Sequence, residues 1–421
     1  MRNCVIALVL IGAAFAAQPI SSICPITRAD EMSPAAETDE QKAQALEAET
    51  ITQLRLLSAL YLREGAPDKA LECLEKICAL QPDNIDALND LIYLALHVRN
   101  YKAAEDAAQK LSARKPDERN TLLALAACYY GLTNEQYRGF LEKADASDFP
   151  GNPYMDSAAY FEQFGMTELV YAELQKELDL PLSAPKNSVE ARMAAMRKTA
   201  FYLSDEGKYA EAARMYGRLL AEMEQAGLDA SGEYNDAAAQ MNYCEARQYE
   251  RDGETDEARQ KYETAVRLAP DNVDAQGHLY VLLKKQGKAD DAKRVFEAAE
   301  APLLARTADE TDINAMNSLA WFYAVAGEKI DDGIKLAQKA VASRPDEPAF
   351  LDTLAELYYV KSWLEENLAQ KEELLRNALK YARIAVAIPK RENVPYYMRQ
   401  QAKMIATFTV YYVRPHPERV P

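Results

Sequence analysis

Prolines recur in this chain at a fixed interval. Pro82, Pro116 and Pro150 are evenly spaced in the sequence. A tyrosine, a glycine and an alanine precede two of the prolines, Pro82 and Pro270, at the same offsets, as Tyr61-x3-Gly65-x4-Ala70 and as Tyr249-x3-Gly253-x4-Ala258. The interval matches the period of roughly 34 residues that is typical of a repeated pair of helices. The chain is therefore predicted to fold as an array of helical hairpins, in which each repeat packs against its neighbours.

The composition agrees with such an array. The chain has 421 residues, more than one hydrophobic core usually serves, but the repeats of a solenoid bury their surfaces only against one another. Hydrophobic residues make up 49% of the chain and charged residues 27%, with only 15 glycines, which suits long helices. From Ile51 the apolar residues follow a helical period, with Leu54, Leu57 and Tyr61 on one face before a break at Gly65. Two antiparallel helices are expected in each repeat.

The repeats share the pattern large-x2-Leu-small-x2-Tyr-x3-Gly-x4-Ala-x3-aromatic-x2-Ala-x4-Pro, which resembles the tetratricopeptide repeat. The best copies are residues 239–272, residues 273–306 and the copy that begins at Ile313. The first of these contains Ala246, Tyr249, Gly253, Ala258, Tyr262, Ala265 and Pro270. The resemblance implies an all-α fold, a right-handed superhelical solenoid of antiparallel helix hairpins with about eight or nine repeats, some of them degenerate.

Departures from the pattern divide the chain. Arg99 stands where the second repeat should have a glycine, Pro181 and Pro185 interrupt a degenerate copy, and an insertion around 363–373 lengthens the last one. Together with the ends of the chain, these departures predict six segments: a signal peptide (1–16), a flexible leader (17–45), an N-terminal array (46–150), a degenerate repeat and joint (151–190), a C-terminal array with a lengthened last hairpin (191–393), and a C-terminal apolar cap segment with a tail (394–421).

The first residues predict export. An apolar run covers residues 4–17, and Ala14-Phe15-Ala16 near its end fits the small-x-small rule of signal peptidase cleavage. The run is shorter than the roughly 20 residues that a bilayer-spanning helix needs. We therefore expect cleavage after Ala16, no membrane span afterwards, and a periplasmic or extracellular location.

Charge and cysteine content narrow the possible partners and the kind of fold. A formal net charge of -17 disfavours nucleic acid and anionic membrane surfaces as partners. Beyond the apolar run, the cysteines are odd in number and scattered, so they predict buried apolar residues rather than a disulfide framework: Cys24, Cys73, Cys78, Cys128 and Cys244. Lipidation at Cys24 and retention of the N-terminus as an anchor are the alternatives to cleavage.

No catalytic, cofactor or metal site is expected from the sequence. His97, His278 and His416 are far apart, and none has cysteines or carboxylates beside it at ligand spacing. The common phosphate-binding, nucleophile and zinc-protease motifs do not occur. The chain is therefore predicted not to be an enzyme.

The resemblance implies that a protein or peptide partner binds on the concave face, to positions 2, 5, 9 and 12 of the first helix of each hairpin. Aromatic residues together with Arg and Asn make adaptable anchors there, although some of the tyrosines are equally expected to pack against the next hairpin. The residues at these positions are Arg55, Asn89, Tyr93, Tyr130, Arg197, Phe201, Tyr243, Arg247, Lys284, Asn317, Trp321, Glu356 and Tyr359. The carboxylate-binding clamp of one subclass of the family is missing.

The sequence thus favours a non-catalytic protein-protein interaction scaffold, exported from the cytoplasm and working in a cell-envelope assembly. Two alternatives stay open: a glycan-binding or hydrolytic module on a helical solenoid, and a self-assembling structural protein. Residues 394–413 are unusually apolar for an end helix. They are expected to cover the last hairpin, to form a homodimer contact, or to fold back into the protein's own groove.

Overall fold

The computed structural model describes residues 39–63, 66–181, 188–387 and 394–409. The predicted signal peptide, most of the predicted leader and the tail from residue 410 lie outside these ranges, as do Cys24 and His416. Within the ranges, the chain forms nineteen helices and no strand. The predicted all-α solenoid of helix hairpins is confirmed.

The helices differ in length, and the last hairpin has two of the longer ones. The first ten are α1 (Asp39–Arg63), α2 (Pro67–Leu80), α3 (Ile85–His97), α4 (Tyr101–Ser112), α5 (Arg119–Gly131), α6 (Tyr137–Ala146), α7 (Pro153–Glu162), α8 (Thr167–Asp179), α9 (Val189–Asp205) and α10 (Tyr209–Gln225). The others are α11 (Gly232–Asp252), α12 (Thr255–Leu268), α13 (Val273–Lys285), α14 (Ala289–Arg306), α15 (Ile313–Ala326), α16 (Ile330–Ser343), α17 (Pro348–Leu364), α18 (Leu368–Ala387) and α19 (Val394–Phe408). The helix α1 begins inside the segment predicted as a leader.

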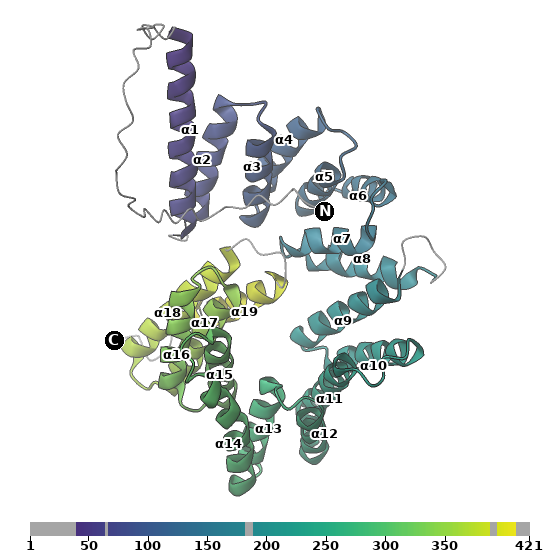
Figure 1. The fold of residues 1–421 in the computed structure, drawn as a ribbon. Helices are drawn as coiled ribbons and strands as arrows, with labels where there is room; N and C mark the ends of the chain where they lie inside the picture. Colours follow the sequence, from purple (N-terminus) through teal and green to yellow (C-terminus); the bar gives the residue numbers. More distant parts are fainter. Residues whose placement is uncertain (1–38, 64–65, 182–187, 388–393, 410–421) are drawn as a thin grey trace, which may run out of the picture.

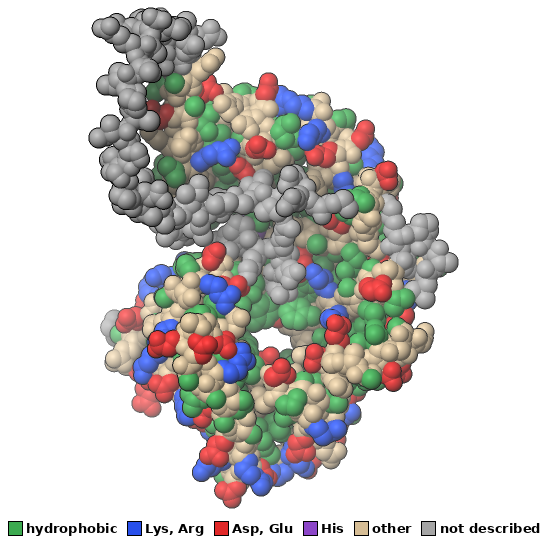
Figure 2. Space-filling model, in the orientation of Figure 1, with side chains coloured by type: hydrophobic (Ala, Val, Ile, Leu, Met, Phe, Trp, Pro, Cys, Tyr) green, Lys and Arg blue, Asp and Glu red, His purple; other side chains and the backbone are tan. Residues whose placement is uncertain are grey.

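Consecutive helices pack in pairs, from α1 with α2 to α17 with α18, and the single helix α19 follows. Figure 1 shows these pairs as one curved array, in which the first helix of each hairpin from α9 to α17 lies on the inner side. The array curves so far that α19 comes back beside α9. Figure 2 shows that an opening bordered mainly by hydrophobic side chains remains inside the curve. The helices α9 to α19 therefore form a nearly closed ring, and α1 to α6 extend beyond it (Figure 1).

Side-chain caps fix where several first helices begin. Asn84 Oδ1 accepts a hydrogen bond from the Ala87 backbone N–H at 3.0 Å before α3, and Asn272 Oδ1 accepts one from Ala275 at 3.0 Å before α13. Such a cap satisfies an N–H group that the first helical turn leaves unpaired. Because the caps recur at equivalent places, the hairpins start in register.

The turn inside a hairpin needs a residue with left-handed backbone geometry. Gly253 supplies it between α11 and α12, with a φ of 84°. Arg99 takes a φ of 59° in the second hairpin, at the position where the repeat pattern calls for glycine. This conformation costs an ordinary L-residue about 1 kcal/mol. The turn is kept all the same, and the Asn100 backbone N–H donates to the Ala95 carbonyl at 2.8 Å.

The buried core runs along the array in successive clusters. The largest extends from Ile51 to Cys244 and includes Phe161 and Leu174, so it continues through the segment predicted as a joint. A second cluster centres on the fully buried Tyr262. The division of the chain into two arrays stays a prediction. The hydrophobic core itself is continuous from the helices before residue 151 to those after residue 190.

The sequence predicts buried cysteines and no membrane span after cleavage. Cys73, Cys78, Cys128 and Cys244 are free and buried, and burial raises the pKa of the Cys128 thiol to about 12. Among the helices of the described ranges, none is both long enough and apolar enough to cross a membrane.

Candidate protein-interaction surface

The inner side of the second half of the array carries a cluster of aromatic and charged side chains from α11 and α13. Arg247 donates to the Tyr243 hydroxyl at 3.1 Å and lies 3.0 Å from His278 Nε2. Its guanidinium is also 4.8 Å from the centre of the Tyr209 ring, at cation-π distance. Burial, with the Arg247 charge beside it, lowers the His278 pKa to about 3. The imidazole is therefore neutral, and its Nε2 accepts from the arginine, which can only donate.

A hydrogen bond between Asp274 of α13 and Trp321 extends this cluster to α15. The Trp321 indole N–H donates to Asp274 Oδ1 at 2.9 Å, which fixes the orientation of a half-buried ring. Burial raises the Asp274 pKa, and the indole and Arg247 oppose that rise. Asn317 is also half-buried, while Lys284 is exposed and forms an ion pair with Glu328 at 2.6 Å. The structure thus brings Tyr243 and Arg247 of α11 together with Trp321 of α15, through Asp274 and His278 of the intervening first helix α13.

The helix α19 covers another part of the inner side. Lys403 forms an ion pair with Glu356 at 2.7 Å, and the Tyr359 hydroxyl lies 3.1 Å from the Thr407 hydroxyl. Near the start of α19, Tyr396 donates to Asp352 Oδ2 at 3.0 Å. Two residues predicted to bind a partner, Glu356 and Tyr359, are therefore in contact with the protein's own last helix.

The same helix reaches α9 and the turns of two earlier hairpins. Arg399 forms an ion pair with Asp205, and a second, longer one with Glu206 at 3.9 Å. Met398 Sδ is 3.9 Å from an Arg99 guanidinium nitrogen and fills the space that a side chain on Gly165 would need. The ring of Phe201, another predicted binding residue, is 6.3 Å from the Tyr396 ring. Of the three expectations for residues 394–413, folding back into the groove describes these contacts, and covering the last hairpin describes the burial of Met404 among residues of α17 and α18.

The remaining predicted residues are dispersed over the rest of the array. Arg55 is exposed, Asn89 is half-buried, and Arg197 is exposed with an ion pair to Glu233 at 3.2 Å. Tyr93 packs edge to face against His97 and Phe164, at ring distances of 4.6 and 5.5 Å. The Tyr130 hydroxyl donates to Glu168 at 3.0 Å. These positions do not form one cluster with Trp321.

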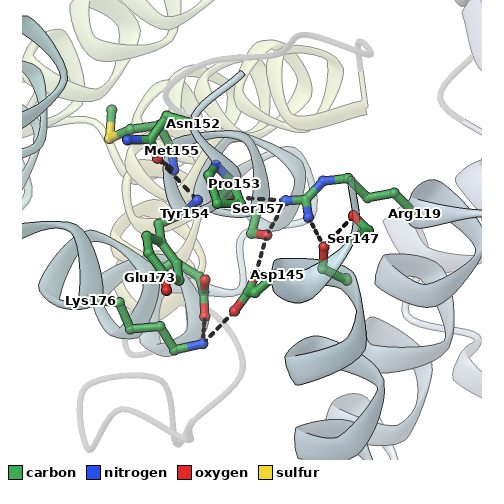
Figure 3. Close-up of polar contacts among 11 residues, drawn as sticks. Arg119, Asp145, Ser147, Asn152, Pro153, Tyr154, Met155, Ser157, Glu173 and Lys176 are labelled. Atoms are coloured by element: carbon green, nitrogen blue, oxygen red, sulfur yellow. Dashed lines mark hydrogen bonds and ion pairs between the residues drawn. The ribbon is translucent and has the colours of Figure 1, made fainter. Parts of the chain in front are cut away.

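A polar cluster that the repeat pattern does not predict lies between α5, α6, α7 and α8 (Figure 3). Arg119 donates to the Pro153 carbonyl at 2.6 Å and to the Ser157 hydroxyl at 2.7 Å. Lys176 lies 2.7 Å from both Asp145 and Glu173. Burial, followed by the nearby Asp145 charge, raises the Glu173 pKa to about 7, and Lys176 opposes this rise. The cluster joins four helices where two hairpins meet, and we assign it a structural role.

Asp352 is the most perturbed carboxyl group on the inner side. Burial, followed by the Glu356 charge, raises the Asp352 pKa to about 7, although the Tyr396 hydroxyl and Lys403 favour its ionised form. An unfolded Asp titrates near pH 4. Between about pH 4 and 7 the Asp352 carboxyl group is therefore ionised in the unfolded chain but protonated in the folded one. The free energy of unfolding that this group contributes falls as the pH rises through that range.

Asp352→Asn is expected to remove that pH dependence. The difference in the free energy of unfolding between variant and wild type should be roughly 2 kcal/mol more favourable to the variant at pH 8 than at pH 5. The reason is that the wild type has a buried charge only at the higher pH. Chemical denaturation at both pH values measures this difference. Asp346→Asn, at an exposed aspartate just before the same helix, is the control and should act equally at both. An Asp352→Asn effect that does not change with pH would contradict the prediction.

Comparison with known proteins gives the class of the fold. Residues 250–303 match the model of a tetratricopeptide repeat family. They run from the end of α11 through α12 and α13 into α14, where the repeat pattern is clearest in the sequence. The predicted resemblance is confirmed over these residues: they carry tetratricopeptide repeats, a type of scaffold suited to protein-protein interaction.

Several solved structures are similar to this chain at low identity. A chain in the structure of Naa15/Naa10 bound to HypK-THB is 19% identical, with 90% of this chain and 60% of that chain covered and a TM-score of 0.28. Yeast Tom70 is 15% identical, with 87% and 96% covered and a TM-score of 0.29. A tetratricopeptide repeat protein from Parabacteroides merdae is 16% identical, with 60% and 97% covered and a TM-score of 0.28. The chain thus spans 60% of the first of these relatives. No curated protein matches it.

Proposed function

We propose that the protein is a non-catalytic scaffold, exported to the cell envelope or beyond, that binds a segment of another protein on the inner side of its array. The observation that carries this proposal is the cluster of Tyr243, Arg247 and Trp321. Each of these side chains is held by a neighbour in the array, so little side-chain entropy is lost when a partner binds. Tyr, Trp and Arg are also the residues that most often dominate binding energy at protein interfaces.

Two features outside this cluster also bear on the proposal. The groove of about 430 Å³ at the ends of the last two hairpins is open and is formed by Lys329, Asp331, Lys361 and their neighbours, away from Trp321. Export is supported by the apolar run at residues 4–17 and the small residues near its end.

Photocrosslinking in the producing cells tests where the partner binds. A photoreactive residue at Lys284, exposed on the inner helix α13, is expected to capture a specific protein, and one at Lys293, exposed on the outer helix α14, is not. Cell fractionation accompanies the test, because the protein should leave the cytoplasm and a variant lacking residues 2–16 should stay there. Equal capture from both positions would count against binding in the groove, and retention of the full chain in the cytoplasm would count against export.

Trp321→Ala is expected to weaken binding of the captured partner about 30-fold, the effect of losing a central aromatic anchor worth about 2 kcal/mol. Isothermal titration of the purified partner measures the change. Lys293→Ala is the matched control and should bind as the wild type does. Circular dichroism of Trp321→Ala must show wild-type helicity, and with that helicity an unchanged affinity would remove Trp321 from the interface.

A further inference from the structure

The side chains of α19 that face the rest of the protein form one stripe. Tyr396, Arg399, Lys403 and Thr407 follow one another at intervals of three, four and four residues, which places them on one face of a helix. Each of them contacts a residue on the inner side of the array. Met404 lies beside this stripe and is fully buried against the last hairpin. The helix is thus bound by its side chains in the way that a separate amphipathic helix would be.

The partners of this stripe are mainly acidic. Arg399 contacts the largely buried carboxylate of Asp205, and Lys403 contacts Glu356. Asp352, which is buried, accepts the hydrogen bond of Tyr396. The Arg399 guanidinium is also 5.8 Å from the centre of the Tyr202 ring. This part of the inner side therefore recognises a helix that presents basic groups and one aromatic hydroxyl at these intervals.

The contact between α19 and α9 also closes the ring. Asp205 and Arg399 are 194 residues apart in the chain. The contacts on the α9 side are few: the Arg399 ion pairs and its approach to the Tyr202 ring, the Phe201 ring against Tyr396, and Met398 against the Arg99 and Gly165 turns. The Arg399–Asp205 pair is largely buried, and the cost of taking both charges out of water offsets much of their attraction. The α9 side of α19 is therefore the side that can separate most easily.

We propose that α19 is an internal ligand of the inner side, and that the partner bound there is a basic amphipathic helix with an aromatic residue, which displaces α19 from α9, Glu356 and Tyr359. This inference rests on the function proposed above and adds the chemical class of the partner and its regulation. Because α19 is tethered to its own binding face, it competes with an effective concentration in the millimolar range. The wild-type protein is therefore largely closed to a helix of this kind, and weakening the tethered contacts opens it.

A peptide of residues 394–409, labelled with a fluorophore, is the probe for this proposal. The full-length mature protein is compared as wild type, Arg399→Glu and Arg383→Glu. Arg399→Glu replaces attraction to Asp205 and Glu206 by repulsion. Arg383→Glu is the control, because Arg383 is exposed on the neighbouring helix α18 and its replacement changes the net charge equally but keeps the Arg399 ion pairs. We expect the peptide to bind Arg399→Glu at least 10-fold more tightly than either the wild type or Arg383→Glu. A peptide carrying Arg399→Glu and Lys403→Glu should bind none of them, and added salt should weaken the interaction.

Hydrogen exchange on the same proteins shows whether α19 leaves its site. Amides of residues 394–409 should exchange faster in Arg399→Glu than in the wild type, while those of α11 to α15 keep their wild-type rates. Asp205→Arg combined with Arg399→Asp reverses the ion pair, and this double variant should recover slow exchange and weak peptide binding. The recovery separates loss of the ion pair from general damage to the fold.

Three outcomes would overturn the proposal. Unchanged exchange and unchanged peptide affinity in Arg399→Glu would mean that α19 is a fixed part of the fold. Faster exchange without peptide binding would mean that this face does not recognise such a helix. A doubled mass of Arg399→Glu, measured by light scattering, would mean that a second copy supplies the helix. None of these outcomes affects the Lys284 crosslink, which tests the proposed function separately.

Discussion

Arg119→Ala should lower the free energy of unfolding by about 4 kcal/mol, one of the two largest single-residue effects that we expect in this chain. Arg119 is only 9% exposed and donates to the Pro153 carbonyl and the Ser157 hydroxyl. It also forms an ion pair with Asp156 at 3.1 Å. Alanine would leave these buried acceptors unpaired at the junction of α5, α6 and α7, and each buried unpaired group is costly. Urea denaturation followed by circular dichroism measures the loss.

The control for this prediction is an arginine on the next helix. Arg138 pairs with Glu135 at 2.6 Å, but both side chains are largely exposed. Surface ion pairs of this kind add little stability, so Arg138→Ala should leave the unfolding midpoint almost unchanged. If the two variants unfolded at the same denaturant concentration, the buried cluster would not hold α5 to α8 together.

Tyr262→Ala is the second change with a large expected effect, a loss of about 4 kcal/mol. Tyr262 is fully buried in the second core cluster, and its ring is stacked on His278 with the centroids 6.0 Å apart. Alanine removes the ring and leaves a cavity between α11, α12 and α13 that the helix backbones cannot fill. Denaturation monitored by circular dichroism gives the size of the loss, and hydrogen exchange gives its location.

Tyr262→Phe separates the ring from its hydroxyl. The hydroxyl donates to Glu250 at 3.0 Å, so its removal should cost only about 1 kcal/mol. In a solenoid each repeat contacts only its neighbours. Faster exchange in Tyr262→Ala should therefore spread over α11 to α14 and leave α3 to α6 as they are. Uniform loss of protection along the array would show that the clusters unfold as one unit.

The fold could be predicted from the sequence because each repeat has the same kinds of residue at its turn, at its helix starts and between its two helices. Gly253 and its equivalents mark the turns, the capping Asn residues mark helix starts, and small residues mark the contacts between helices. These signals act within a single repeat, so they can be read from the chain directly. Even Arg99 is informative, because the left-handed turn survives there without its glycine.

Only part of the candidate protein-interaction surface could be predicted from the sequence in the same way. Repeat positions identified Tyr243, Arg247 and Trp321, which the structure places close together on the inner side. The pattern could not reveal that Glu356 and Tyr359 face α19, because that contact depends on how far the whole array curves. Curvature is the sum of small rotations between hairpins, and no single repeat encodes it. The Arg119 cluster was missed for a related reason, since its members lie on four helices and share no spacing.

The return of α19 to α9 also sets an order of events during folding. The helical hairpins have local contacts and can form as the chain emerges, but the Asp205–Arg399 contact spans 194 residues and needs all the helices from α9 to α18 in place. Closing such a long loop has an entropic cost that the few contacts at α9 must offset. Joining the ends is therefore the last step of folding. During synthesis the inner side stays open until residues 394–409 arrive, and in that interval a helix of the proposed kind would meet no competitor.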